Sequence, residues 1–238
     1  MKASFVAVAL CILLSHPAQA AASLYDDFSG TQIDSSIWHV QLPFSGSSVN
    51  ESGGNAIFKS RGQLITIPQL AGSPAGVLDI QGSFAFTGGS DEVFRVATRT
   101  DGAVINVFGE LGGPVVVFNG PGIGGGSVGV EDETSSGGSG IGYANVSFAL
   151  NTYYSFRITD DGNNIAVYIS DFGNPVLAES DTYSLGSYVG LYDRETYGGY
   201  NQNPGVSLEY ISITVPEPSV FALLGFGVAA LTVARRRA

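Results

Sequence analysis

The densest run of chemically active side chains in the sequence is Glu131-Asp132-Glu133. Paired carboxylates are the groups with which glycoside hydrolases cleave their substrates, one acting as general acid and the other as nucleophile or base. These three residues are consecutive, so neighbours would point to opposite faces of an extended strand. They also lie in residues 120–142, a segment rich in glycine and serine that is typical of a flexible surface loop or an irregular edge. We therefore expect a solvated acidic tip here, and we assign no catalytic residue in the chain.

Composition excludes most other active-site chemistry. The 238 residues include one cysteine and two histidines, and Cys11 and His16 lie in an N-terminal segment that we expect to be removed. The mature chain then has no thiol, and His39 stands beside Trp38 with no serine in a nucleophile elbow to pair with. A formal net charge of −11 and a pI near 4.4 argue against a nucleic-acid partner.

Candidate ligand contacts gather in residues 188–203, where tyrosines alternate with charged and amide side chains. A sugar offers an apolar ring face and a rim of hydroxyls, which suit aromatic plates edged by polar groups. The candidate glycan-binding residues are Tyr188, Tyr192, Asp193, Arg194, Tyr197, Tyr200 and Asn201. In the alternative interpretation, Tyr188 and Tyr192 pack with a sheet while Tyr197 and Tyr200 cover a glycine-rich loop.

Both ends of the chain have the composition of export signals. Residues 1–20 combine Lys2, an apolar run over residues 5–14 and the small-residue pattern Ala18-Gln19-Ala20, which predicts a cleaved signal peptide. Residues 216–238 begin with Pro216-Glu217-Pro218 and continue with fifteen uncharged residues, 220–234, that predict a short transmembrane helix. The chain then ends in a basic cluster, Arg235, Arg236 and Arg237, which the positive-inside rule places in the cytoplasm.

This C-terminal arrangement of Pro-Glu-Pro, apolar helix and basic cluster resembles the PEP-CTERM sorting signal of Gram-negative bacteria. The resemblance implies export by the secretion machinery across the inner membrane and anchoring by the C-terminal helix. It further implies processing near the motif by an exosortase, and a final location at the cell surface or outside the cell. Such proteins typically occur in organisms that secrete exopolysaccharide. A plain C-terminal anchor that is never processed is the alternative.

The middle of the chain, residues 21–215, is predicted to form one all-β domain. Short apolar or alternating runs recur about every ten residues between turn signals, without helical periodicity. The clearest hairpin joins residues 153–159 to 165–169 through Asp160-Asp161-Gly162-Asn163-Asn164. A second hairpin is expected to join residues 93–98 to 104–108 through Thr100-Asp101-Gly102, and residues 146–150 are expected to form a further strand.

Two groups of segments resemble the opening and closing strands of concanavalin A-like lectin/glucanase sandwiches. The first group is Tyr25-Asp26-Asp27-Phe28, Ile33 to Trp38 and Gln63 to Ile67; the second is residues 153–169, 188–192 and 207–213. The resemblance implies an antiparallel jelly-roll β-sandwich with a concave face that commonly meets glycans. It also implies a structural Ca²⁺, for which we test Asp26, Asp27 and Glu209. The Glu-x-Asp-x-x-Glu motif of laminarinase-type glycosidases with this fold is missing, since Glu179-Ser180-Asp181 is followed by Ser184 in place of the second glutamate.

Together these features predict an exported cell-envelope or matrix protein with a non-catalytic sandwich that binds exopolysaccharide. A glycan-active hydrolase or lyase that uses scattered carboxylates is the first alternative, and a structural matrix protein without a ligand is the second. Four of the 10 basic residues and one of the 21 acidic residues lie in the end segments. The domain at 21–215 therefore has 6 bases and 20 acids, a net charge of −14.

Overall fold

A computed structural model describes residues 22–67, 77–88, 91–105, 109–134, 139–170, 172–181, 183, 186–195 and 205–215. The expected signal peptide, residues 1–20, and the expected sorting segment, residues 216–238, lie outside this part. Every regular element within it is a β-strand. None of the described residues forms a helix long and apolar enough to cross a bilayer.

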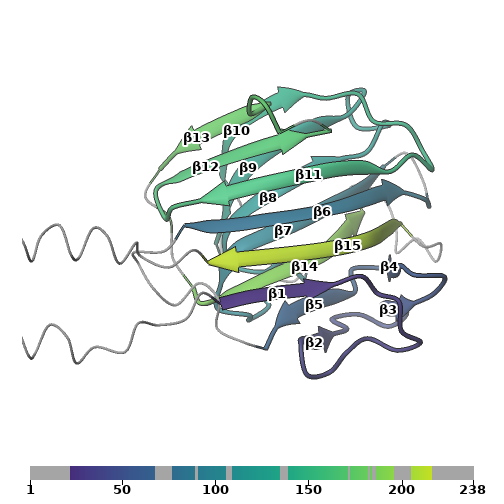
Figure 1. Cartoon of the computed structure of the whole chain (residues 1–238). Helices are drawn as coiled ribbons and strands as arrows, with labels where there is room; N and C mark the ends of the chain where they lie inside the picture. Colours follow the sequence, from purple (N-terminus) through teal and green to yellow (C-terminus); the bar gives the residue numbers. More distant parts are fainter. Residues whose placement is uncertain are drawn as a thin grey trace, which may run out of the picture. The chain divides into compact units, whose positions relative to one another are not determined.

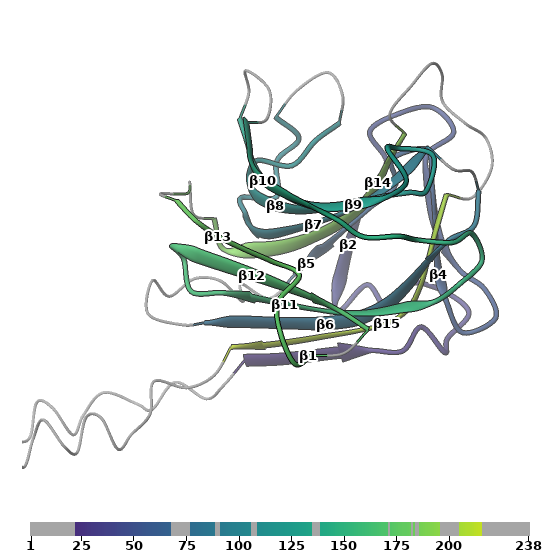
Figure 2. The same cartoon turned by 90° about the horizontal axis from the view of Figure 1, so that it is seen from above.

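The strands form two antiparallel sheets that pack face to face, as Figures 1 and 2 show. Sheet A has the order β13-β12-β11-β6-β15-β4-β3, with β1 also paired to β15, and sheet B has the order β10-β9-β8-β7-β14-β5-β2. Sheet A contains β1 (Ala22–Asp26), β3 (Ser48–Glu51), β4 (Ala56–Lys59), β6 (Leu78–Phe86), β11 (Tyr154–Asp160), β12 (Asn164–Ile169), β13 (Leu177–Ser180) and β15 (Val206–Val215). Sheet B contains β2 (Trp38–Gln41), β5 (Gln63–Thr66), β7 (Glu92–Thr100), β8 (Gly113–Asn119), β9 (Ser127–Glu133), β10 (Ser139–Asn145) and β14 (Tyr188–Glu195). The expected all-β jelly-roll sandwich is confirmed.

Phenylalanine side chains from both sheets fill the centre of the core. Phe84 of β6 lies 4.9 Å from Phe118 of β8 and 5.1 Å from Phe94 of β7, measured between ring centroids, and all three side chains are fully buried. Strand periodicity explains this arrangement, because alternate residues of each strand point into the space between the sheets. A second, smaller apolar cluster lies on the other face of sheet B and includes Ala97, Val115 and Val117.

The first and last strands of the domain lie side by side in sheet A. Ala22 at the start of β1 pairs with Val215 at the end of β15, and the pairing continues to Asp26 and Ile211. The Asp26 carboxylate then accepts hydrogen bonds from the Phe28 amide at 2.9 Å and from the buried Trp38 indole at 2.7 Å. This aspartate therefore ties β1 of sheet A to β2 of sheet B.

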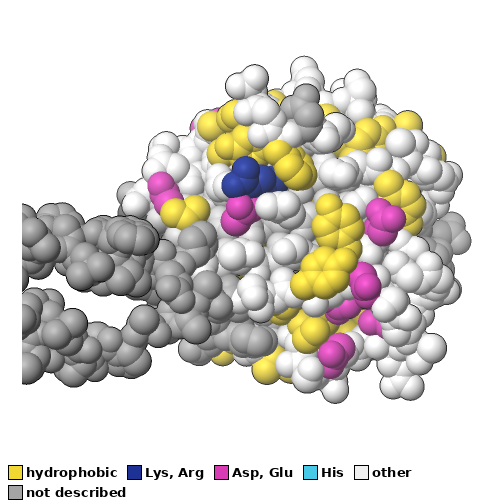
Figure 3. Space-filling view, viewed as in Figure 1, with side chains coloured by type: hydrophobic (Ala, Val, Ile, Leu, Met, Phe, Trp, Pro, Cys, Tyr) yellow, Lys and Arg dark blue, Asp and Glu magenta, His cyan; other side chains and the backbone are white. Residues whose placement is uncertain are grey.

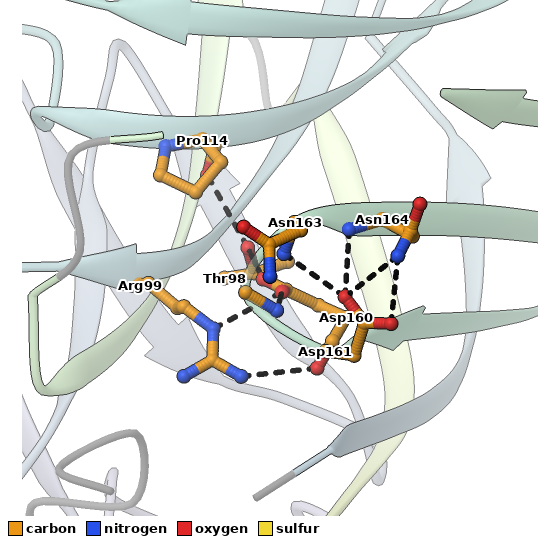
Figure 4. Close-up of polar contacts among 8 residues, drawn as sticks. Thr98, Arg99, Pro114, Asp160, Asp161, Asn163 and Asn164 are labelled. Atoms are coloured by element: carbon orange, nitrogen blue, oxygen red, sulfur yellow. Dashed lines mark hydrogen bonds and ion pairs between the residues drawn. The ribbon is translucent and has the colours of Figure 1, made fainter. Parts of the chain in front are cut away.

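A buried polar cluster joins the two sheets at the expected β11–β12 hairpin, which the structure confirms. Asp160 at the end of β11 accepts hydrogen bonds from Thr98 Oγ1 at 2.5 Å and from Arg99 Nε at 3.0 Å (Figure 4). The Arg99 and Asp160 side chains are 1% and 0% exposed, so each charge depends on the other for compensation. Gly162 adopts a φ of 93° in the turn, a conformation that glycine adopts without strain.

Two expectations for local structure are wrong. Residues 104 and 105 form no hairpin strand beside β7: Val104 forms an isolated bridge with Leu111. The rest of the expected strand, residues 106–108, lies outside the described part. Residues 146–150 form no strand, and the preceding glycine-rich segment instead supplies β9 and the sheet-edge strand β10. Glycine did not prevent strand formation there, because apolar residues at alternate positions of β9 pack into the core.

Candidate functional site

Glu131 and Glu133 lie together on the outer face of sheet B, the face turned away from sheet A. Val128 and Val130 of β9 point into the core, so the glutamates that alternate with them point outward. Glu131 pairs across the sheet with Val115, a member of the second apolar cluster. The expected solvated acidic tip is therefore wrong, since the triplet lies in a strand and Glu133 is only 3% exposed.

A buried arginine from β7 holds both glutamates. Arg95 Nη2 lies 2.9 Å from Glu131 Oε2, and its Nη1 forms an ion pair with Glu133 Oε1. A third carboxylate, that of Glu110, lies 3.5 Å from Arg95 Nη1 and 2.7 Å from Arg194 Nη1. Three carboxylates and two guanidinium groups thus form one ionic cluster on this face.

The two glutamates of β9 titrate in opposite directions. Burial raises the pKa of Glu133 to about 7, because the effect of burial is larger than the opposing effect of the Arg95 charge. Burial also acts to raise the pKa of Glu131, but Arg95 and the Tyr143 hydroxyl outweigh it and leave this pKa below its ordinary value. Both carboxylates contact Arg95, and at slightly acidic pH Glu133 holds its proton while Glu131 is ionised. A protonated and an ionised carboxyl group side by side is the arrangement that an acid–base catalyst requires.

The connection between β7 and β8 covers this face of sheet B. We call residues 101–112 the covering segment; its residues 106–108 lie outside the described part. The Gly102 carbonyl accepts a hydrogen bond from Gln41 Nε2 at 2.9 Å, and the Gly109 carbonyl accepts one from Gln63. Leu111 is fully buried in the second apolar cluster, close to Gly190 of β14, where a Cβ would come within 2.3 Å of Leu111 Cδ1. The segment therefore packs onto the sheet as part of the folded domain.

Under this cover the ionic cluster has little access to solvent. The side chains of Arg95 and Glu110 are each 3% exposed and that of Glu133 is 2% exposed, whereas that of Glu131 is 14% exposed. Tyr143 of β10 hydrogen bonds to Glu131 and is 52% exposed, so the cluster meets the surface at this edge. A substrate would reach Glu131 from the β10 edge but would find Glu133 shielded.

The candidate glycan residues in β14 are distributed between the core and the covered face. Tyr192 is 1% exposed and contacts Arg95, and Asp193 is fully buried, so neither presents a surface to a sugar. Tyr188 is half-buried against the second apolar cluster, and Arg194 pairs with Glu110. This part of the prediction is wrong for Tyr192 and Asp193, because β14 is a central strand of sheet B. Tyr197, Tyr200 and Asn201, and all residues of the sorting motif, lie outside the described residues.

The three residues tested for calcium do not fit a metal site. Both carboxylate oxygens of Asp26 accept hydrogen bonds, one from the Trp38 indole. Asp27 accepts a hydrogen bond from the Ser29 amide at 3.1 Å, and Glu209 is exposed on β15. In the described part of the chain, no three His, Cys, Asp or Glu side chains come together as metal ligands.

The outer face of sheet A has a different character. Figure 3 shows hydrophobic side chains in a row on this face, with Asp and Glu side chains beside them. Tyr25 of β1 is 62% exposed, and its ring stacks on Tyr210 of β15 with 6.5 Å between centroids and 29° between planes. Tyr153, just before β11, is 45% exposed. These tyrosines were not among the expected site residues, although each alternates in sequence with a core residue.

Comparisons with known proteins identify both the C-terminal signal and the fold. Residues 214–237 match the PEP-CTERM protein-sorting motif, which indicates an exported, membrane-anchored exosortase substrate of Gram-negative bacteria. No curated protein matches the chain in sequence.

Solved structures resemble the domain at low sequence identity. The carbohydrate recognition domain of Emp47p superposes with a TM-score of 0.59 at 12% identity, covering 81% of this chain and 94% of that one. A Bacillus licheniformis β-glucanase gives 0.57 at 13% identity, covering 82% and 99%. The exoplasmic/lumenal domain of VIP36 in a Ca²⁺/Man2-bound form gives 0.56 at 12% identity, covering 80% and 86%. The fold is that of concanavalin A-like lectin/glucanase sandwiches, and lectins and hydrolases both adopt it.

Proposed function

We propose that this protein is an exported cell-surface or matrix component whose sandwich domain binds polysaccharide without cleaving it. The C-terminal motif supports export, membrane anchoring and exosortase processing, and the fold is compatible with carbohydrate binding. The observation that favours binding over hydrolysis is the Arg95 guanidinium, which engages both Glu131 and Glu133 beneath the covering segment. A general acid must reach the glycosidic oxygen and a nucleophile must reach the sugar carbon, and this burial opposes both.

The export part of the proposal is tested by secretion and mass analysis of the chain with and without residues 216–238. The full chain is expected in the membrane fraction before processing, and outside the cell with a lower mass and without Arg235 to Arg237 afterwards. The truncated chain is expected to bypass the membrane-bound stage. Retention of the three arginines in the mature protein would contradict exosortase processing and favour a plain anchor.

Hydrolysis is the second candidate function, because Glu131 and Glu133 share one face of β9 and their pKa values are displaced in opposite directions. The assay is release of reducing ends from laminarin and from mixed-linkage β-glucan by the mature protein, with Glu131→Gln as the matched variant. Non-catalytic binding predicts no release by either protein. Release by the wild type that the Glu131→Gln variant loses would establish the hydrolase and refute the first proposal.

A further inference from the structure

The outer face of sheet A contains a fixed aromatic platform that the expected site residues do not include. Tyr25 and Tyr210 lie with their ring planes 29° apart. Cross-strand pairing positions them, since Tyr25 faces Ser212 on β15, two residues beyond Tyr210. A register shift between Leu208 and Tyr210 accommodates an extra residue at this point of β15. The two rings are thus held by backbone pairing while one of them stays largely in solvent.

A third tyrosine extends the platform across the neighbouring strands. The Tyr153 hydroxyl donates a hydrogen bond to Asn55 Oδ1 at 2.9 Å and lies 2.8 Å from Ser207 Oγ. The Tyr153 hydroxyl has one proton and donates it to Asn55, so in the second contact the Ser207 hydroxyl is the donor and the Tyr153 oxygen is the acceptor. These two contacts fix the ring of Tyr153, so little rotamer freedom remains to be lost when a ligand binds.

The positions around the rings favour hydroxyl-bearing ligands. Tyr25 pairs with Ser212 of β15, which is partly exposed, whereas Ser83 of β6, which pairs with Tyr210, is buried. Small hydroxyl groups beside aromatic rings offer both a flat apolar surface and hydrogen-bonding partners, which match the two kinds of surface on a sugar. A protein partner of ordinary affinity would instead require an apolar interface centre that excludes charge.

The negative charge around the tyrosines favours some classes of polysaccharide over others. Glu209 is exposed beside Tyr210, and Figure 3 shows other acidic side chains along the same row. The domain as a whole has a net charge of −14, with 6 bases against 20 acids in residues 21–215. Uronate or sulfate groups would be repelled at such a surface. We propose that Tyr25, Tyr153 and Tyr210 form a binding platform for an uncharged polysaccharide chain, an inference that rests on the proposed glycan-binding function.

The test is affinity electrophoresis of the mature protein in gels that contain one polysaccharide each: laminarin, hydroxyethyl cellulose, galactomannan or, as the anionic probe, alginate. The wild type is expected to be retarded by at least one neutral polymer and not by alginate. The Tyr25→Ala/Tyr210→Ala variant is expected to bind that polymer about tenfold more weakly, given the contribution of two aromatic contacts. The Tyr25→Phe/Tyr210→Phe variant keeps both rings and is expected to retain most of the binding. Circular dichroism and thermal unfolding report whether each variant is folded.

Phe172→Ala is the matched control, because it removes an exposed aromatic ring that is part of neither the platform nor the ionic cluster. If this variant loses binding while the sheet A double variant keeps it, the platform is refuted but the glycan-binding function stands. Unchanged binding of a folded Tyr25→Ala/Tyr210→Ala variant likewise refutes the platform alone, and retardation by alginate alone refutes its proposed preference for uncharged chains. A wild type that none of the four polymers retards refutes the glycan-binding function itself.

Discussion

The outer faces of the two sheets differ in chemistry and in access. The face of sheet B holds the ionic cluster around Arg95, closed over by the covering segment. The face of sheet A holds the exposed Tyr25 and Tyr153, and its ion pair between Arg157 and Asp79 has side chains 32% and 21% exposed. The face with the more reactive side chains is thus the less accessible one. Reactive residue types alone would have directed attention to the closed face.

This difference separates stability from recognition within one domain. Buried charges that satisfy one another stabilise a particular arrangement but have little opportunity to contact a ligand. Exposed aromatic rings contribute little to folding and remain available for contact. We expect substitutions in the two faces to affect different measurements, and the following predictions test this from the largest effect to the smallest.

The largest effect is expected from Arg95→Met. This change leaves Glu131 and Glu133 without their buried counter-ion, and loss of one partner from such a cluster costs about 3–5 kcal/mol in the free energy of unfolding. Urea unfolding measures it. Arg157→Met is the matched control on sheet A, where a partly exposed pair is worth about 0–1 kcal/mol. Equal losses in the two variants would remove the proposed distinction between the faces.

A somewhat smaller loss is expected from Leu111→Ala in the covering segment. Leu111 is fully buried, so the change removes apolar contacts and leaves a cavity, at a cost of about 2–4 kcal/mol by urea unfolding. Leu150→Ala, at a residue that is 42% exposed, should change stability by less than about 0.5 kcal/mol. A Leu111→Ala variant as stable as the wild type would mean that the segment is only loosely attached to sheet B.

The pH dependence of stability should report Glu133. Its folded-state pKa of about 7 lies above its ordinary value, because burial disfavours the charged form. The folded protein therefore holds a proton that the unfolded chain releases, and stability falls as pH rises from about 4.5 to about 7, by on the order of 1–3 kcal/mol. Thermal unfolding across this range should show the decline in the wild type and a flatter profile in Glu133→Gln. Identical profiles would assign the pH dependence to other groups.

Only a small effect on stability is expected from Tyr25→Ala in the platform. The side chain is 62% exposed and its main contact is the stack with Tyr210, so the loss should be below about 1 kcal/mol in thermal or urea unfolding. A much larger loss would mean that the platform serves the fold. The contrast with sheet B would then disappear.

Sequence patterns predicted the structure correctly where residues close together in the sequence determine it. Alternation in residues 153–169 and the Asp-Gly turn identified the β11–β12 hairpin, and the opening and closing segments indicated the sandwich. The covering segment could not be predicted in this way, because Asp101-Gly102 looks like a hairpin turn and the packing of Leu111 depends on strands distant in sequence. The glycine-rich composition of residues 120–142 indicated a loop at the acidic triplet, so the shared face of Glu131 and Glu133 was missed. For Tyr192 the sequence left two interpretations open, glycan contact and packing with the sheet, because composition does not reveal that β14 is central.

The position of β15 has a consequence for the order of events during export. This strand, residues 206–215, lies inside sheet A and pairs with β1, β4 and β6. In the export that we propose, it would be the last part of the domain to cross the membrane. Among the described strands, β1 pairs only with β15, so the first and last strands of the domain meet. Such distant pairing slows folding, because bringing the two chain ends together costs conformational entropy before the stabilising strand contacts form. During translocation sheet A should therefore stay incomplete. It can form fully only after residues 206–215, which lie next to the sorting signal, have emerged.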